Sequence, residues 1–93
     1  MNGKKLSADE IETGLAGVSG WRAEGDKLQK SYKFENFAES LAFVNKAGGI
    51  AERHDHHPDI TFGWGYADFV ITTHSEGGIT SKDFALAGEL DAL

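Results

Sequence analysis

Hydrophobic residues in this sequence follow two spacings in turn, and this switching constrains the fold more than any other feature. Ile11, Leu15 and Val18 have a period near 3.6 residues, which is typical of one buried face of a helix. From Leu28 to Phe34 a largely apolar face, interrupted by Lys30, alternates with a polar one, as in a half-buried strand. The helical, strand and helical patterns then recur over about 36–55, 60–74 and 84–93. The predicted element order is therefore α-β-β-α-β-β-α.

Capping residues mark where two of the helices begin. Ser7 and Glu10 have the spacing of a capping box, in which each side chain hydrogen-bonds the backbone amide of the other residue. We expect the helix that follows to end near Gly20. Thr80 and Asp83 have the same spacing, with the shorter aspartate in place of glutamate, so they predict the start of a C-terminal helix.

The central helix is predicted from its own boundary residues. Asn36 is a good N-cap and Pro58 cannot continue a helix, so we expect it to run from about Asn36 to about Arg53 or Asp55. Gly48-Gly49 lies inside it, and each glycine costs about 1 kcal/mol relative to alanine. We therefore expect either a close approach of another part of the chain at these glycines or a locally loose helix.

The alternating segments predict two hairpins. Glu24-Gly25-Asp26 is a turn signal in the first, and Gly65 to Asp68 can turn the chain in the second. Four strands and three amphipathic helices predict an α+β fold, a four-stranded antiparallel sheet covered on one face by helices. The length of 93 residues leaves room for one small domain, which buries only about 60 to 65% of its unfolded surface. Self-association is therefore a reasonable expectation.

Charge and composition exclude several classes of function. Nine Lys and Arg residues against fifteen Asp and Glu give a net charge of −6, which would repel nucleic acid and anionic membrane surfaces. No cysteine is present, so disulfides, thiolate zinc sites and cysteine nucleophiles are excluded. Met1 to Glu10 contains no apolar stretch, so we expect neither a signal peptide nor a membrane anchor and predict a cytoplasmic protein.

The four histidines lie close together, between positions 54 and 74. Histidine exchanges protons near neutral pH, so a group of imidazoles suits general acid–base catalysis. His54-Asp55-His56-His57 also offers nitrogen and oxygen ligands, which His74 could complete into a zinc, nickel or copper site. A solvated helix end, where protonated imidazoles favour the helix dipole, is the plainest alternative. The small core and the aromatic segment Phe62–Tyr66 leave a protein-dimerisation module as a further one.

An ordered set of residues resembles the signature of the pterin-4a-carbinolamine dehydratase family. The set consists of Glu52, His56-His57-Pro58, Trp64, His74 and Asp83. Further matches, which extend the resemblance to about residues 5–93, are Gly20-Trp21, Leu28 to Phe34, Phe37, Phe43, Thr73-His74, Gly77 to Thr80 and Lys82-Asp83. The glycine-rich, aromatic stretch from Thr61 to Tyr66 departs from the polar residues that relatives usually carry there.

The resemblance implies a single pterin-4a-carbinolamine dehydratase-like domain over residues 1–93. It implies a hydro-lyase that removes water from 4a-hydroxytetrahydrobiopterin, also called pterin-4a-carbinolamine, and yields quinonoid dihydropterin for the recycling of tetrahydrobiopterin. No metal and no other cofactor is implied. The implied partners are the pterin, an aromatic amino-acid hydroxylase as a functional link, and further copies of the chain in a homodimer or homotetramer that meets partly through sheet edges. Animal members of the family also serve as the dimerisation cofactor of a homeodomain transcription factor.

The resemblance also implies site residues. His56, His57 and His74 carry over as the catalytic set, in which His74 and one of the pair act as acid and base while the other anchors the pterin. The residues expected to bind the substrate are Asp55, Pro58, Thr72, Thr73, Ser75 and, as a pocket wall, Trp21. Glu52 and Asp83 are expected to support the histidines. Because Glu52 and His56 are four residues apart, they would meet on one helix face if the helix continued that far.

Overall fold

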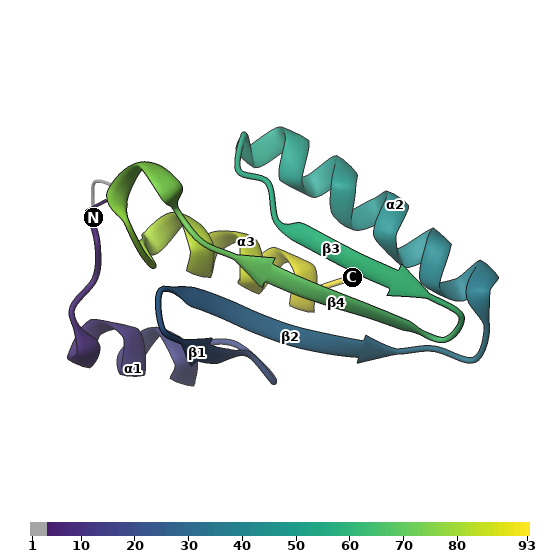
Figure 1. The fold of residues 1–93 in the computed structure, drawn as a ribbon, viewed down its shortest axis with the longest axis horizontal. Coiled ribbons are helices and arrows are strands. Elements are labelled where there is room, and N and C mark those ends of the chain that lie inside the picture. The colour runs from purple at the N-terminus through teal and green to yellow at the C-terminus, as the bar shows by residue number, and fades with distance from the viewer. Residues whose placement is uncertain (1–3) are drawn as a thin grey trace.

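The computed structural model of the protein describes residues 4–93. Its elements in chain order are α1 (Ala8–Ala16), β1 (Arg22–Glu24), β2 (Lys27–Lys33), α2 (Phe37–His54), β3 (Asp59–Gly63), β4 (Tyr66–Ile71), the 3-10 turn η1 (His74–Glu76) and α3 (Ser81–Asp91) (Figure 1). This order confirms the α-β-β-α-β-β-α prediction and adds one short turn. Within the described range, no helix is both long and apolar enough to cross a membrane.

The strands form one antiparallel sheet in the order β1-β2-β4-β3. β4 lies between the two hairpins, and its Phe69 stands opposite Lys30 of β2 and Ile60 of β3. Alternate residues of β4 are buried, as a strand with one covered face requires. The buried core residues are Leu6, Trp21, Leu28, Ala47, Ile50, Ala67, Phe69, Ile71, Ile79, Leu86, Ala87 and Leu90. Leu6, Trp21 and Ile79 lie in the segments before α1, β1 and α3, and the other core residues come from the sheet and from α2 and α3. Helices α2 and α3 therefore cover one face of the sheet, as predicted.

The first helix is shorter than predicted. α1 ends at Ala16, and the amide of Gly17 bonds back to the carbonyl of Gly14, so the expectation of an end near Gly20 is wrong. Gly20 has a φ of +76°, a left-handed conformation that leads the chain into β1. A Cβ atom at Gly14 would lie 2.6 Å from the ring of Phe84, so the missing side chain lets α1 and α3 pack closely.

The second hairpin turns earlier than predicted. Trp64 and Gly65 form the turn and β4 begins at Tyr66, so the expected turn at Gly65 to Asp68 is wrong. Gly65, the second of the two turn residues, has a φ of +82°, a left-handed conformation that favours glycine at this position of a turn. Asp68 is instead a strand residue, whose carboxylate accepts a 2.6 Å hydrogen bond from the hydroxyl of Ser31 on β2.

The central helix confirms its predicted boundaries. The Asn36 side chain accepts a hydrogen bond from the amide of Glu39, and α2 runs unbroken through Gly48-Gly49 to His54. A Cβ atom at either glycine would meet nothing within 4 Å in the described part of the chain, so no close approach accounts for them. The helix therefore forms despite two positions that weaken it.

Candidate active site

The chain changes direction sharply where α2 ends. Asp55 has a φ of 50°, in the left-handed region, and the amide of His56 bonds to the carbonyl of Ala51, an arrangement that closes many helices. His56 therefore leaves the helix, and its expected contact with Glu52 is wrong. Glu52 instead contacts His57, with 2.5 Å between Oε2 and Nε2.

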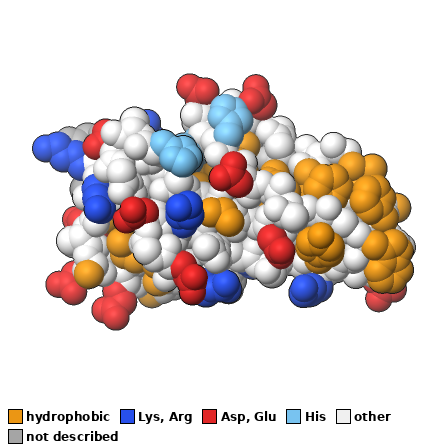
Figure 2. Space-filling view, viewed as in Figure 1, with side chains coloured by type: hydrophobic (Ala, Val, Ile, Leu, Met, Phe, Trp, Pro, Cys, Tyr) orange, Lys and Arg blue, Asp and Glu red, His pale blue; other side chains and the backbone are white. Residues whose placement is uncertain are grey.

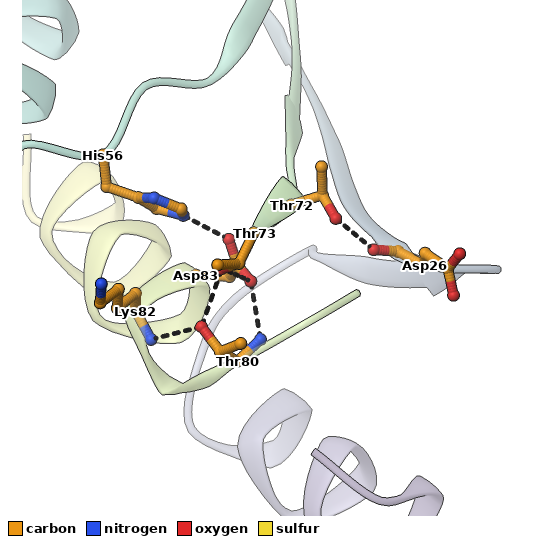
Figure 3. A network of polar contacts seen from close by, with 7 residues as sticks. All are labelled: Asp26, His56, Thr72, Thr73, Thr80, Lys82 and Asp83. Atoms are coloured by element: carbon orange, nitrogen blue, oxygen red, sulfur yellow. Dashed lines mark hydrogen bonds and ion pairs between the residues drawn. The ribbon is translucent and has the colours of Figure 1, made fainter. Parts of the chain in front are cut away.

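His56 points toward the start of α3 and pairs with a buried carboxylate (Figure 3). Its Nε2 lies 2.5 Å from Oδ1 of Asp83; the His56 side chain is 12% exposed and that of Asp83 is 0% exposed. The other carboxylate oxygen accepts hydrogen bonds from the hydroxyl of Thr73 at 2.9 Å and the amide of Thr80 at 2.7 Å. Asp83 thus caps α3, as predicted, and also orients one histidine of the pair.

The hydroxyl groups around Asp83 form one directed chain of hydrogen bonds. Thr73 donates to Asp83, and each hydroxyl carries a single proton, so Thr80 donates to Thr73 across 2.8 Å. The hydroxyl oxygen of Thr80 in turn accepts from the backbone amide of Lys82 at 3.2 Å. Because the carboxylate accepts at both oxygens, we assign the proton shared with His56 to Nε2, which leaves Nδ1 of that ring for a ligand.

The other two histidines of the predicted set are more exposed. The side chains of His57 and Glu52 are 55% and 77% exposed. His74 begins the turn η1 directly after Thr73 and is exposed as well. The bridge between Thr73 and Gly78 closes the loop that carries His74, so this histidine is presented by a short, tied loop.

These three histidines line one cavity of about 310 Å³, a size that suits a small ligand. The lining residues are Asp55, His56, His57, Thr72, Thr73, His74, Ser75 and Lys82. All of them except Lys82 belong to the predicted site. The hydroxyl of Thr72 donates to the carbonyl of Asp26 at 2.6 Å, so the β1–β2 turn supports one wall of the cavity (Figure 3).

Two predicted substrate-binding residues lie outside this lining. Trp21 is 6% exposed within the core, and its indole Nε1 donates to Asp91 at 2.9 Å. Asp91 and Asp83 lie at opposite ends of α3, so the structure does not support Trp21 as a pocket wall. Pro58 lies between the histidine pair and the start of β3 and is not among the lining residues.

The histidines do not gather around a metal position. His54 lies 3.3 Å from Glu89 on α3, a third carboxylate, separate from those that hold His56 and His57. Among residues 4–93, no three His, Cys, Asp or Glu side chains are placed to hold one metal ion. The geometry therefore does not support the alternative of a histidine metal cluster.

A second buried polar cluster, which the hydrophobic pattern does not predict, lies at the end of α3. One oxygen of Asp91 accepts from Nζ of Lys30 at 2.8 Å and from Nε1 of Trp21 at 2.9 Å, and the other accepts from the amide of Ser19 at 2.8 Å. Burial alone would raise the pKa of Asp91, but its hydrogen-bond donors, Lys30 foremost, outweigh burial and leave the pKa lowered. Burial and the neighbouring carboxylate raise the pKa of Tyr32. The clue in the sequence is Lys30 on the otherwise apolar face of β2.

Comparison with known proteins identifies the family. The family model for pterin 4 alpha carbinolamine dehydratase matches residues 4–93. A protein of Sulfolobus acidocaldarius, provisionally named a pterin-4-alpha-carbinolamine dehydratase, is 44% identical over 96% of this chain and 98% of its own length. A protein of Mycobacteroides abscessus with the same provisional name is 46% identical over 92% of each chain. The crystal structure of a transcriptional coactivator/pterin dehydratase from Brucella melitensis matches with a TM-score of 0.91 at 30% identity, covering 96% of this chain and 97% of that one.

The family model and the relatives agree on one class of protein, the hydro-lyases that dehydrate a pterin carbinolamine. The chain belongs to the pterin 4 alpha carbinolamine dehydratase family and is a hydro-lyase by that membership. The resemblance inferred from the ordered histidine, proline and aspartate residues is thereby confirmed.

Proposed function

We propose that the protein, as one dehydratase domain, converts 4a-hydroxytetrahydrobiopterin to quinonoid dihydropterin and so serves the recycling of tetrahydrobiopterin. The observation that carries the proposal is the cavity lined by three histidines, one of them oriented by the buried carboxylate of Asp83. Imidazole donates and accepts protons near neutral pH, and this dehydration needs one proton delivered and one removed. The residues of the cavity therefore match the chemistry of the reaction.

The reaction breaks the bond between C4a of the pterin and its hydroxyl oxygen. A proton must reach that oxygen so that it leaves as water, and the proton on N5 must be removed so that the quinonoid product forms. We assign these two transfers to His56 and His74, which line the cavity from the end of α2 and from η1. Each positioned proton transfer contributes typically about 10²–10⁴-fold to the rate.

The hydrogen bond to Asp83 is the reason for assigning a proton transfer to His56. With Nε2 held by a buried carboxylate, the ring keeps one orientation and presents Nδ1 at a fixed position. The carboxylate also stabilises the imidazolium that forms when Nδ1 takes up a proton. His57 pairs with the exposed Glu52, so its side chain can change conformation when the pterin binds. This suits His57 to anchoring the pterin.

The direct test is the rate at which the purified protein speeds the decay of the 4a-hydroxytetrahydropterin absorbance. A phenylalanine hydroxylase generates the substrate in place, and each reaction is run with and without a chelator. We expect acceleration that the chelator does not reduce and that the double variant His56→Ala, His74→Ala abolishes.

A matched control separates this effect from loss of folding. His54→Ala should keep the full rate, because His54 pairs with Glu89 outside the cavity. Circular dichroism establishes that each variant is folded. The proposal is contradicted if the folded wild type gives no acceleration, or if the double variant keeps full activity.

We also propose that the protein works as a homodimer or homotetramer. Phe37, Leu41 and Trp64 are 44%, 40% and 71% exposed, and the ring of Phe37 stacks on Phe62 at 5.7 Å. Figure 2 shows hydrophobic side chains gathered at the end of the molecule that carries the start of α2 and the β3–β4 turn. Contiguous apolar patches mark interaction surfaces more often than single apolar residues do. A monomer in analytical ultracentrifugation at micromolar concentration would contradict this proposal, whereas dissociation of an oligomer by Trp64→Ser would support it.

A further inference from the structure

Lys82 is the one cavity-lining residue that the predicted site does not include, and its side chain has no evident structural role. It lies in the first turn of α3, where a cation opposes the helix dipole. Its backbone amide, not its ammonium group, takes part in the cap by donating to Thr80. In the part of the chain that the structure describes, Lys82 forms no ion pair. A residue that breaks a local rule without a compensating contact is a candidate for ligand binding.

The charge of the cavity differs from that of the whole chain. The chain carries −6, whereas the eight lining residues include one acid, Asp55, against Lys82 and three histidines. Two further carboxylates, Asp83 and Glu52, pair with His56 and His57, so Lys82 is the one permanent cation among the lining residues. Figure 3 shows His56 and Lys82 on the same side of the start of α3. A lysine without a carboxylate partner attracts anionic groups locally, even in an acidic protein.

The geometry of the pterin indicates which part of a substrate would meet this charge. If the histidines contact C4a and N5, the substituent lies beside the reacting edge, because it is carried by C6, the ring atom bonded to N5. The ring is neutral, and pterins differ from one another mainly in this substituent. An ammonium group on the cavity lining can therefore discriminate between substrates only through the group carried on C6.

We propose that the site takes pterins whose C6 substituent carries an anionic group, a phosphate or a carboxylate, and that Lys82 binds that group. This proposal rests on the proposed dehydratase function, because it places the pterin ring against the histidines. Lysine binds such groups as a point charge, so the preference should depend on charge more than on shape. Lys82 is thus a specificity-determining residue of the site.

The test compares kcat/KM for three 4a-hydroxytetrahydropterins that differ only at C6, bearing a neutral dihydroxypropyl group, a phosphate monoester or a carboxylate. We expect the wild type to prefer at least one anionic form about tenfold or more, since a hydrogen bond to a charged group has that value. The preference should fall toward one in Lys82→Gln and persist in Lys82→Arg. Lys46→Gln, which removes an exposed lysine from α2, is the matched control and should keep the ratio. Which anion is preferred distinguishes phosphate from carboxylate substrates.

Two outcomes separate this proposal from the proposed function. Equal kcat/KM for all three pterins, with clear acceleration of each, would overturn the role of Lys82 and leave the dehydratase intact. Absence of acceleration would remove the dehydratase, and calorimetry with unreactive 7,8-dihydropterins bearing the same groups would then decide on Lys82. Tighter binding of an anionic form that Lys82→Gln abolishes supports the proposal, and equal affinity overturns it.

Discussion

Two histidines that are adjacent in sequence, His56 and His57, each pair with a carboxylate at the same contact distance. His56 with Asp83 and His57 with Glu52 each bring nitrogen and oxygen to 2.5 Å. The first pair is 12% and 0% exposed, whereas the second is 55% and 77% exposed. Water and salt screen an exposed pair, but a buried carboxylate depends on its partners for stabilisation. The two interactions therefore differ in strength because of burial and not because of contact distance.

The surroundings widen the difference. Asp83 also accepts from Thr73 and Thr80, so the buried pair is part of the network that closes the start of α3. Glu52 lies on the exposed last turn of α2, and its carboxylate can exchange His57 for water at little cost. The buried pair thus holds His56 in one orientation, as the proposed proton transfer requires, while the exposed pair leaves His57 mobile.

The largest expected effect is on turnover, when His56 and His57 are replaced one at a time. His56→Gln should lower kcat by about 10²–10⁴-fold, because it removes one positioned proton transfer. His57→Gln should mainly raise KM and lower kcat by less than about tenfold, as expected for a group that binds substrate. Stopped-flow kinetics on both variants measures the two parameters. Equal losses in kcat would disprove the division of roles.

The next effect is on stability, when each carboxylate becomes an amide. In Asp83→Asn one acceptor oxygen replaces two where three donors converge, so the free energy of unfolding should fall by about 2–4 kcal/mol. Glu52→Gln is the matched control and should change it by less than about 1 kcal/mol. Urea denaturation followed by circular dichroism gives both values, and similar costs would mean that burial does not separate the pairs.

A third carboxylate, Asp91, extends the comparison to the pH dependence of stability. Its side chain is 15% exposed and pairs with that of Lys30, which is 16% exposed. Its pKa is lowered in the folded protein, so the stability it contributes is complete above its ordinary value of 3.8 and is lost as the pH falls through the folded-state pKa. Asp91→Asn should lower the free energy of unfolding at pH 7 by about 1–3 kcal/mol and flatten its decline in acid. Urea melts at pH 7 and pH 3 test this. Parallel declines in wild type and variant would show that Asp91 does not contribute in this way.

The smallest expected effect strengthens the helix that carries the exposed pair. Gly49 is exposed, and a Cβ atom there would meet nothing within 4 Å. Gly49→Ala should therefore raise the free energy of unfolding by about 0.5–1 kcal/mol. Because α2 already extends to His54, kcat/KM should not change. Thermal denaturation and the dehydration assay check both statements, and a loss of activity would mean that looseness in α2 matters to the site.

The parts of the fold that could be predicted depend on residues close together in sequence. Ser7, Asn36 and Thr80 each begin a helix where expected, because a cap involves contacts over only two or three positions. The strands and their buried faces follow from alternation alone. The ends of elements were less predictable: Val18 continues a helical spacing, yet the chain has already left α1 at Gly17.

The partners within the site could not be predicted from spacing. The i to i+4 relation of Glu52 and His56 assumes continuous helix, and a single left-handed residue, Asp55, redirects both histidines. The position of Trp21 could not be predicted from spacing either, because its partner, Asp91, lies 70 positions away and holds the indole in the core. By contrast, seven of the eight residues that line the cavity could be named from the family resemblance, which includes such distant contacts implicitly.

The most direct test of the central claim compares kcat/KM for Asp83→Asn and Glu52→Gln, each at a temperature where circular dichroism shows the variant folded. Neither substitution removes a histidine, so the comparison isolates the role of the carboxylate partner. We predict a loss of at least about tenfold for Asp83→Asn and of less than about threefold for Glu52→Gln. Equal losses, or a greater loss for Glu52→Gln, would contradict the claim that the buried partner makes His56 a proton-transfer residue.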